Sequence, residues 1–282
     1  MITITTRGEL SALLDTQRKS GKKIGFVPTM GALHEGHASL VAEARRRADT
    51  VVVSIFVNPT QFNDAADLKN YPRTPGQDAV LLEKSGADIL FLPSVHEMYP
   101  NGTNEEVPVP DIGILGKVME AAHRPGHFEG VINIVSRLFT IVGECTAFFG
   151  EKDFQQLAVI RKMVREMNMN VVIVGCPIVR ESDGLAMSSR NARLGREERA
   201  AAPFISQVLF RSREMWNEKK TAEEIKRFVK EEFEKHSLFR LEYFEIADAG
   251  TLEAAVSREG KKVACIAAWL GSVRLIDNVV YA

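Results

Sequence analysis

The sequence predicts an α/β fold: a Rossmann-like, doubly wound parallel sheet, followed by a smaller α+β unit with a short antiparallel sheet. Short apolar runs alternate with amphipathic helical segments as far as Gly175, which is typical of parallel strands joined by helices. Closely spaced alternating runs then follow two helical stretches, as in a small antiparallel sheet. The 282 residues, 45% of them hydrophobic, are enough for one large domain and one smaller domain.

The first helix is predicted from a capping box at Thr6 and Glu9, and it runs to about Lys19 before Gly21. A strand follows at 24–28, then a loop at 29–36 and a helix whose apolar residues recur from 38 to 48. The run 50–57 contains four valines, an isoleucine and a phenylalanine, so it is predicted to be a fully buried strand. Together these segments make a strand–helix–strand unit, the length of a right-handed parallel crossover.

The alternation continues with predicted helices at 78–84, 131–142 and 154–167 and predicted strands at 88–92, 147–149 and 171–174. A charge-rich segment, 193–199, then leads into predicted helices at 203–216 and 222–236 and strands at 241–246, 263–269 and 273–276. We therefore predict two domains: 1–178, whose parallel sheet is expected to bind ligands, and 179–282, which carries the small antiparallel sheet.

Composition excludes several classes of protein. The net charge is −1, and a nucleic-acid reader usually has a basic excess, so no nucleic-acid partner is expected. No run of about 18 apolar residues occurs, which predicts no membrane span, and the charged N-terminal segment has no signal-peptide core. Cys145, Cys176 and Cys265 are far apart and odd in number, which favours a reducing cytoplasm over a disulfide framework or a zinc ribbon.

The loop Met30 to His37 follows the first strand of the crossover and leads into its helix. Ligands bind at the carboxyl ends of parallel strands, and a helix N-terminus attracts phosphate through its free N–H groups. Gly31 and Gly36 allow close backbone approach or a positive φ. The loop lacks G-x-G-x-x-G, and although its glycines have P-loop spacing, His37 and Ala38 replace the lysine and the hydroxyl.

His34 and His37 are three residues apart, so in a helical turn they share one face. Two imidazoles there could donate hydrogen bonds to phosphate oxygens. The alternatives are ordinary polar loop residues, or a zinc pair that lacks the H-E-x-x-H spacing and an obvious third ligand. The position at a ligand-binding edge favours phosphate.

His34-Glu35-Gly36-His37 resembles the H-x-G-H signature of the nucleotidyltransferase superfamily, which includes class I aminoacyl-tRNA synthetases. An ordered series of motifs resembles, more narrowly, the pantoate–β-alanine ligase (pantothenate synthetase) family. It comprises the segments 27–37, 56–62, 71–74, 124–128, 149–156, 187–191, 267–271 and 274–278. The series spans nearly the whole chain, and no motif position departs from the family pattern.

The resemblance implies that ATP and (R)-pantoate give pantoyl adenylate and pyrophosphate, after which the amine of β-alanine displaces AMP to form pantothenate for coenzyme A. It also implies a need for Mg²⁺, bound mainly through the ATP phosphates, and a homodimer whose smaller domain closes over the site. The direct protein ligands of Mg²⁺ are left open.

The resemblance also implies the site residues. The ATP site comprises Met30, Gly31, Ala32, Leu33, His34, Glu35, Gly36, His37, Gly150, Glu151, Lys152, Asp153, Val179, Met187, Ser188, Ser189 and Arg190. Pantoate is expected at Gln61 and Gln156, and β-alanine at Gln61, with Tyr71 and Asn58 as weaker candidates for the same pocket. His37, His34 and Lys152 are the expected catalytic groups, with His37 treated in the family as a proton donor.

Several of these residues have a structural interpretation as well. Asp153 is a natural N-cap with Gln156 at N3, and we expect Asp153 to serve both cap and ATP but Gln156 to serve the substrate. Gln61, after a turn forced by Asn58-Pro59, could instead bond to backbone. Arg124 and His127 belong either to a mobile flap or to a rigid turn.

Met187 to Arg190 resembles the second signature of the superfamily, the counterpart of the synthetase K-M-S-K-S loop, and two hydroxyls with a guanidinium suit a triphosphate. Two rival functions remain. One is a nucleotidylyltransferase that stops after transferring AMP or CMP to a phosphorylated substrate. The other is a binding or scaffold protein on a retired enzyme fold.

Overall fold

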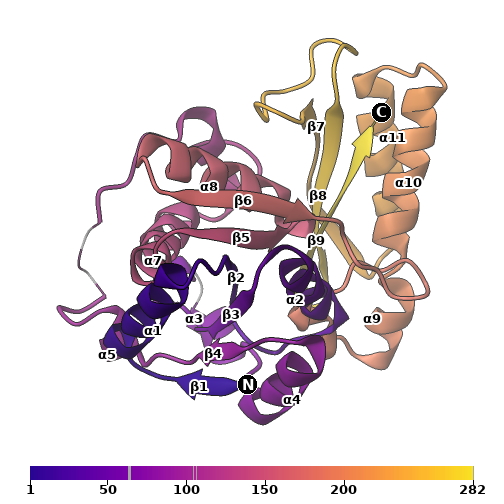
Figure 1. Cartoon of the computed structure of the whole chain (residues 1–282). Coiled ribbons are helices and arrows are strands. Elements are labelled where there is room, and N and C mark those ends of the chain that lie inside the picture. The colour runs from indigo at the N-terminus through magenta and orange to yellow at the C-terminus, as the bar shows by residue number, and fades with distance from the viewer. Residues whose placement is uncertain (63–64, 104, 106, 282) are drawn as a thin grey trace.

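The structure is a computed structural model that describes residues 1–62, 65–103, 105 and 107–281. Two sheets dominate it (Figure 1). The larger sheet has six parallel strands in the order β1-β4-β3-β2-β5-β6. Their bounds are β1 Ile2–Ile4, β2 Ile24–Thr29, β3 Thr50–Ile55, β4 Ile89–Phe91, β5 Cys145–Gly150 and β6 Val171–Cys176. The predicted doubly wound parallel sheet is confirmed.

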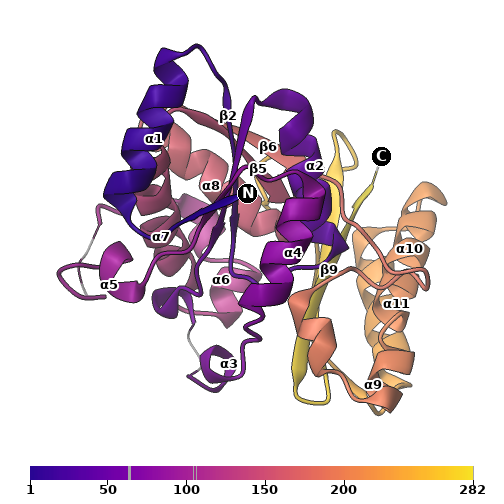
Figure 2. The ribbon, with the colours of Figure 1, turned by 60° about the horizontal axis from the view of Figure 1, so that its bottom comes forward.

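Helices cover both faces of this sheet (Figure 2). One face carries α1 (Arg7–Lys19), α7 (His127–Val142) and α8 (Phe154–Glu166), whose apolar stripes bury one hydrophobic core. The other face carries α2 (Glu35–Arg47) and α4 (Pro75–Ser85) over a second core. Burial of these stripes on both faces explains why the central strands are apolar throughout rather than alternating.

The strand order places a topological switch point between β2 and β5. From β2 the chain moves outward to β3, and β5 later returns to the opposite side of β2. The loops after β2 and β5 therefore leave the same edge of the sheet in opposite directions and open a crevice between them. This is the edge at which the sequence predicts the ligand.

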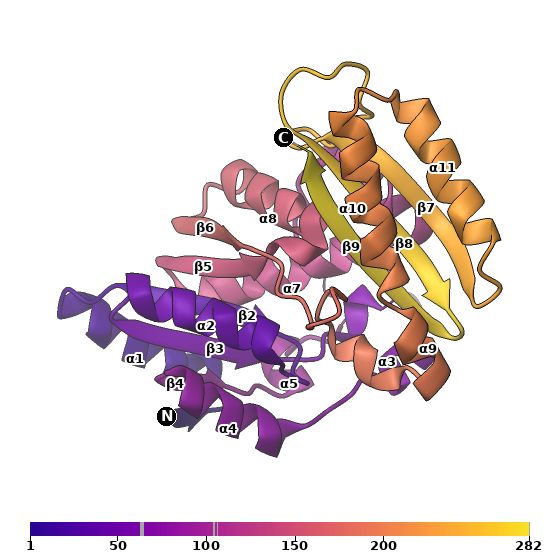
Figure 3. The same cartoon turned by 90° about the vertical axis from the view of Figure 1, so that its right-hand side faces the viewer.

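The second sheet is antiparallel and has the order β7-β8-β9, with bounds Phe239–Asp248, Lys262–Leu270 and Val273–Tyr281. Helices α10 (Phe204–Asn217) and α11 (Ala222–Glu234) cover its outer face, and α9 (Arg196–Ala201) precedes them (Figure 3). The opposite face meets the first core, to which Val263 and Cys265 belong. The small sheet thus stands directly against the carboxyl ends of β5 and β6 (Figure 1).

Every long predicted element is present, with ends that differ by a few residues. The short elements are absent from the sequence prediction: they are β1, α3 (Ala65–Lys69), α5 (Val95–Met98), α6 (Glu120–His123), α9, and the 3₁₀ turns η1 (Pro59–Gln61), η2 (Gly113–Gly116), η3 (Glu151–Asp153) and η4 (Ser189–Arg193). Thr6 caps α1 by accepting from the Glu9 backbone N–H at 3.4 Å, although the described residues contain no return bond from the Glu9 side chain.

The predicted boundary at 178/179 falls between the end of β6 at Cys176 and Leu185, where the next hydrophobic core begins. The division into two domains stays a prediction. Among the helices of the described residues, none is long and apolar enough to cross a membrane.

Candidate functional site

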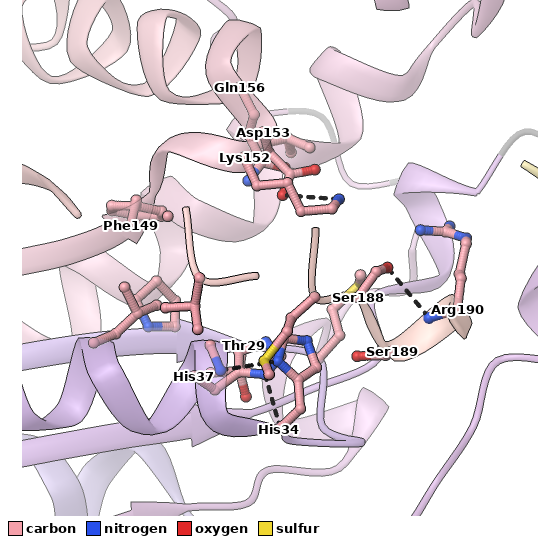
Figure 4. Close-up of a pocket in the computed structure, with 18 of the residues that line it drawn as sticks. Thr29, His34, His37, Phe149, Lys152, Asp153, Gln156, Ser188, Ser189 and Arg190 are labelled. Carbon is pink, nitrogen blue, oxygen red and sulfur yellow. Dashed lines mark hydrogen bonds and ion pairs between the residues drawn. The ribbon is translucent and has the colours of Figure 1, made fainter. Parts of the chain in front are cut away.

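A cavity of about 220 Å³ opens at the switch point. Residues 177–179 and 187–190, which follow β6 and lead to the small sheet, form one wall. Figure 4 shows His34 and His37 on one side, Lys152, Asp153 and Gln156 facing them, and Ser188 to Arg190 on a third side. Of the expected site residues, the cavity is lined by Met30, His34, Gly36, His37, Gln61, Tyr71, Gly150, Lys152, Asp153, Gln156, Val179, Met187, Ser188, Ser189 and Arg190. Gly31, Ala32, Leu33, Glu35, Glu151 and Asn58 do not line it.

The loop before α2 is held from behind by Asp78 of α4. Both Gly31 and Ala32 have positive φ, at 81° and 49°, a conformation that only glycine adopts freely. The buried Asp78 carboxylate accepts the N–H of Ala32 at 3.0 Å and that of Leu33 at 2.8 Å. Asp78 thus compensates for the unusual backbone, a role that sequence reasoning missed because nothing in the local pattern around a helix start indicates it.

His34 and His37 each bind the backbone of the turn through the ring nitrogen Nδ1. His34 Nδ1 accepts from the N–H of Gly36 at 3.1 Å, and His37 Nδ1 accepts from the N–H of His34 at 3.3 Å. A nitrogen that accepts carries no proton, so each neutral ring has its proton on Nε2 and keeps that donor for another partner.

The electrostatics agree with two neutral rings. Burial, and then the Lys152 charge, lower the pKa of His34 to about 4. Burial, then the neighbouring His34, lower the pKa of His37 to about 3. Near pH 7 both rings are therefore neutral N–H donors, the form in which the sequence analysis has them donate to phosphate oxygens.

Lys152 and Asp153 sit on η3, the turn that follows β5. The Lys152 side chain is largely buried and its Nζ lies 3.9 Å from Asp153 Oδ2. Asp153 is the N-cap residue of α8 by position, but its side chain makes no capping hydrogen bond, so the predicted structural role is wrong. The cause is the preceding 3₁₀ turn, which gives Asp153 a φ of −92° and a ψ of 62° instead of the extended conformation typical of a cap.

Gln156 lines the cavity one turn into α8. Within the described ranges its side-chain amide has no hydrogen-bond partner. It therefore remains available to a ligand, as the sequence analysis expects.

Gln61 lies at the end of η1 and is held by neighbours in the protein. Asn58 Nδ2 donates to Gln61 Oε1 at 3.2 Å, and Gln61 Nε2 lies 2.9 Å from the Met30 sulfur. Among the described residues the Gln61 side chain thus bonds to other side chains rather than to backbone, unlike the structural alternative. Asn58 itself is fully buried, caps η1 and receives the Tyr99 hydroxyl at 2.7 Å, so it orients Gln61 from behind.

The second signature meets the first across the cavity. The Ser189 hydroxyl donates to the carbonyl oxygen of Ala32 at 2.9 Å, and Ser188 caps η4 by accepting from the Arg190 N–H at 3.3 Å. The Val179 carbonyl oxygen accepts from the Met187 N–H at 3.0 Å, and both residues line the cavity. These contacts bring residues far apart in sequence into one wall.

Arg190 is paired within the protein. Its Nη2 lies 2.7 Å from Oδ2 of Asp67, and Arg193 binds the other oxygen of the same carboxylate at 2.8 Å. The Arg190 guanidinium also lies 5.8 Å from the centre of the Tyr71 ring. Sequence reasoning missed Asp67, because α3 carries no periodic signal.

Arg124 and His127 form a turn at the start of α7. His127 donates from Nδ1 to the carbonyl oxygen of Gln61 at 2.9 Å, and Arg124 Nη1 lies 3.1 Å from its Nε2. Burial, followed by the Arg124 charge, lowers the pKa of His127 to about 4, so the ring is neutral. In this structure the two residues belong to a hydrogen-bonded turn rather than an open flap.

The described residues contain no group of three or more His, Cys, Asp or Glu side chains placed to hold a metal ion. Asp153 is the sole carboxylate among the described residues that line the cavity, and it is about half exposed. The arrangement fits a magnesium ion held mainly by a ligand's phosphates, because Mg²⁺ commonly takes one or two carboxylates plus phosphate oxygens and water.

Comparisons with known proteins agree on one family. The family model for pantoate-beta-alanine ligase matches residues 2–280. The pantothenate synthetase of Bacteroides thetaiotaomicron is 53% identical, over 100% of this chain and 99% of that protein. The pantoate–beta-alanine ligase of Schizosaccharomyces pombe is 48% identical over 94% of each.

Solved structures give the same result. The crystal structure of pantothenate synthetase from Thermus thermophilus has a TM-score of 0.92 and 43% identity, covering 99% of both chains. That of the ligase from Francisella tularensis, complexed with beta-gamma ATP and beta-alanine, has a TM-score of 0.82 and 33% identity, covering 100% of this chain and 98% of the other.

Proposed function

Given that the chain belongs to the pantoate–β-alanine ligase family, we propose that its cavity activates (R)-pantoate as the acyl adenylate and passes the acyl group to β-alanine. The chain is a ligase that forms a C–N bond at the expense of ATP, in pantothenate biosynthesis. The proposal concerns the intermediate and the residues that make it.

One observation carries the proposal. Two neutral imidazoles that keep Nε2–H free face Lys152 across a cavity that is also lined by two side-chain amides. Donors and a cation suit phosphates, while the amides of Gln61 and Gln156 suit a carboxylate and the hydroxyl groups of a small acid. The partner of the Gln61 amide nitrogen is a thioether, a weak acceptor that a carboxylate replaces at little cost.

The ATP-binding wall then consists of three segments. They are Met30 to His37, Gly150 to Asp153, and Val179 with Met187 to Arg190. Lys152 acts as a point charge that can bridge phosphates, and the Val179 backbone faces adenine or ribose. Arg190 reaches a triphosphate by loosening its pair with Asp67.

In the first step a pantoate carboxylate oxygen attacks the α-phosphorus of ATP. A new P–O bond forms while the bond to pyrophosphate breaks, so no bond to the protein is needed. His34 and His37 donate from Nε2 to oxygens that gain negative charge, and Lys152 offsets the charge on the leaving pyrophosphate. Placed donors of this kind often contribute about 2.7–4 kcal/mol each.

In the second step the β-alanine amine attacks the acyl carbon. The C–N bond forms, the bond from carbon to the AMP oxygen breaks, and the amine loses a proton. Gln61 is shared by pantoate and β-alanine in this scheme, which brings amine and adenylate together. Proximity alone can supply about 7–11 kcal/mol of the barrier.

The cavity volume supports a site that opens and closes. Its 220 Å³ lies below the roughly 300–1,000 Å³ typical of pockets for such ligands. We expect the unit 179–282 to move outward for ATP and then to shield the adenylate from water, as lids do.

Magnesium would enter with ATP. Asp153 is the residue placed to complete its coordination, and the ion would neutralise phosphate charge there. The family resemblance further implies a homodimer, which light scattering of the purified protein tests. A reducing cytoplasm is consistent with the three cysteines, which are buried and unpaired.

The test is exchange of labelled pyrophosphate into ATP with pantoate and Mg²⁺ but without β-alanine. We expect exchange that depends on pantoate, and a loss of roughly 10²-fold in Lys152→Ala and in His37→Ala. Lys22→Ala is the matched control, because Lys22 is exposed beyond the opposite end of β2. Protein that forms pantothenate from all three substrates yet shows no exchange would overturn the adenylate, and AMP transfer to a phosphorylated acceptor would favour the nucleotidylyltransferase.

A further inference from the structure

Strand β9 of the small sheet holds the turn that carries Lys152. The Asn278 side chain is buried, with 4% of its surface exposed. Its Nδ2 donates to the carbonyl oxygen of Glu151 at 2.8 Å and to that of Lys152 at 2.9 Å. One side-chain amide near the end of the chain therefore donates hydrogen bonds to two consecutive carbonyl groups of η3.

Asn278 is itself held in place by its neighbours. Its backbone N–H donates to Asp277 Oδ1 at 2.7 Å. Arg180 binds both oxygens of the same carboxylate, at 2.7 and 3.0 Å, and donates to the Asn278 carbonyl oxygen at 3.3 Å. A bidentate pair of this kind is geometrically specific, so it fixes the orientation of the Asn278 side-chain amide.

The turn η3 has few other restraints from side chains. Gly150 precedes it without a side-chain cap, and Asp153, its last residue, makes no capping hydrogen bond to α8. In the part of the chain that the structure describes, the Lys152 ammonium meets only the Asp153 carboxylate, at 3.9 Å. The position of Lys152 consequently depends on its backbone, and Asn278 is the side chain that binds this backbone.

We propose that Asn278 is a positioning residue for the ATP half-reaction, which sets Lys152 by binding the carbonyl groups of residues 151 and 152. This rests on the proposed function of Lys152. It also gives the C-terminal segment 274–278 a role beyond covering the site. The small sheet must pack against η3 for Lys152 to be correctly positioned.

The test measures pantoate-dependent pyrophosphate exchange in Asn278→Ala and in the isosteric Asn278→Asp, which cannot donate. We expect kcat/KM for ATP to fall by about ten- to a hundredfold, the effect of roughly 1 Å of misplacement. In a Lys152→Ala background the same change at position 278 should alter the exchange less than about twofold, because the group being positioned is gone. An equal loss in both backgrounds, or no loss in either, overturns the proposal.

The matched control is Tyr281→Phe, which removes a buried hydrogen bond of 2.8 Å to Ser212 from the same strand without touching η3. It should lower the melting temperature and leave exchange unchanged. If it slows exchange as much as Asn278→Ala, Asn278 is only a structural residue and the proposal fails. Should Asn278→Ala unfold at the assay temperature, Asn278→Ser replaces it in the same cycle. Full activity of Lys152→Ala alone would instead refute the proposed role of Lys152.

Discussion

The Ser189 hydroxyl donates to the carbonyl oxygen of Ala32 at 2.9 Å and so joins the two signature loops, which lie 157 residues apart in the chain. Ala32 is the residue whose φ of 49° shapes the loop before His34. The bond therefore ties the segment after β6 to the backbone that carries both histidines. The position of this segment is therefore linked by a hydrogen bond to the backbone conformation of the loop before α2.

Ser189→Ala should lower kcat/KM for ATP by up to about tenfold, because one hydrogen bond contributes roughly 0.5–1.5 kcal/mol. Initial rates at varied ATP concentration test this. Ser206→Ala is a suitable control, since Ser206 makes a comparable bond of 2.9 Å to the Pro203 carbonyl within the C-terminal unit. Equal effects of the two changes would contradict a specific link between the loops.

The neutral histidines predict a particular pH dependence. Their pKa values, about 4 and about 3, put both rings in the N–H donor form throughout the neutral range. We expect kcat/KM for ATP in the exchange reaction to be level between about pH 6 and pH 8 and to fall only below about pH 5. A decline as the pH rises through 6.5 would mean that the imidazolium form binds ATP.

A substitution at His37 tests whether the residue acts as a neutral hydrogen-bond donor or as a cation. His37→Gln retains an N–H donor near the Nε2 position without any charge, so it should keep more exchange activity than His37→Ala. If the two variants lose activity alike, the donor role of His37 is wrong.

Glu120 and Arg274 form a buried ion pair between α6 and β9, with two oxygen–nitrogen distances of 2.9 and 2.8 Å. Burial alone would raise the pKa of Glu120, but the hydrogen bonds and charge of Arg274 hold it at about 2. A depressed carboxylate pKa stabilises the folded chain above the normal value of 4.5, and this stabilisation is lost as the pH falls from 4.5 toward 2.

Glu120→Gln should therefore lower the free energy of unfolding by roughly 1.5–3 kcal/mol at pH 7, because charged hydrogen bonds are lost while Arg274 keeps its pair with Glu242. The difference from wild type should shrink as the pH falls below about 4.5. Urea unfolding at several pH values measures it. Glu97→Gln, which removes an exposed pair with Arg7, should cost less than about 1 kcal/mol.

The long elements could be predicted because burial imposes a period on the sequence. Helix α7 places one apolar face on the sheet, and its residues recur at helical spacing: Val131, Ile134, Val135 and Leu138. Strand β3 is covered on both sides and is apolar throughout. Both elements can therefore be predicted without any tertiary information. The edge that holds the candidate site was predictable for a related reason, since loops after parallel strands meet at one edge, whereas most individual site residues were implied by the family resemblance. Strand β1 has three residues, and its pairing with β4 leaves no such period.

The supporting residues were not predictable because they act across long separations in the chain. Asp78 binds the loop at Ala32 and Asp67 pairs Arg190, yet both occupy an ordinary local context. Asn278 lies in a motif of the family resemblance, but its bonds to η3 leave no local signal. The Asp153 cap was predicted from residue type and from Gln156 at N3, and it is wrong because the 3₁₀ turn before α8 sets a different backbone. Local patterns place ligand-facing residues on loops but say little about what holds those loops.

Gly130 on α7 gives a final prediction about what holds Gln61. A Cβ built at Gly130 would lie 2.6 Å from the Cα of Gln61 and closer still to the Thr60 carbonyl oxygen, so only glycine fits against this turn. Gly130→Ala should destabilise the chain by about 1–3 kcal/mol through overpacking. By displacing Gln61 it should also raise KM for pantoate more than KM for ATP. Gly8→Ala is the control, because nothing lies within 4 Å of that position in α1 and alanine favours a helix. Equal changes in the two KM values would mean that η1 does not position the acid.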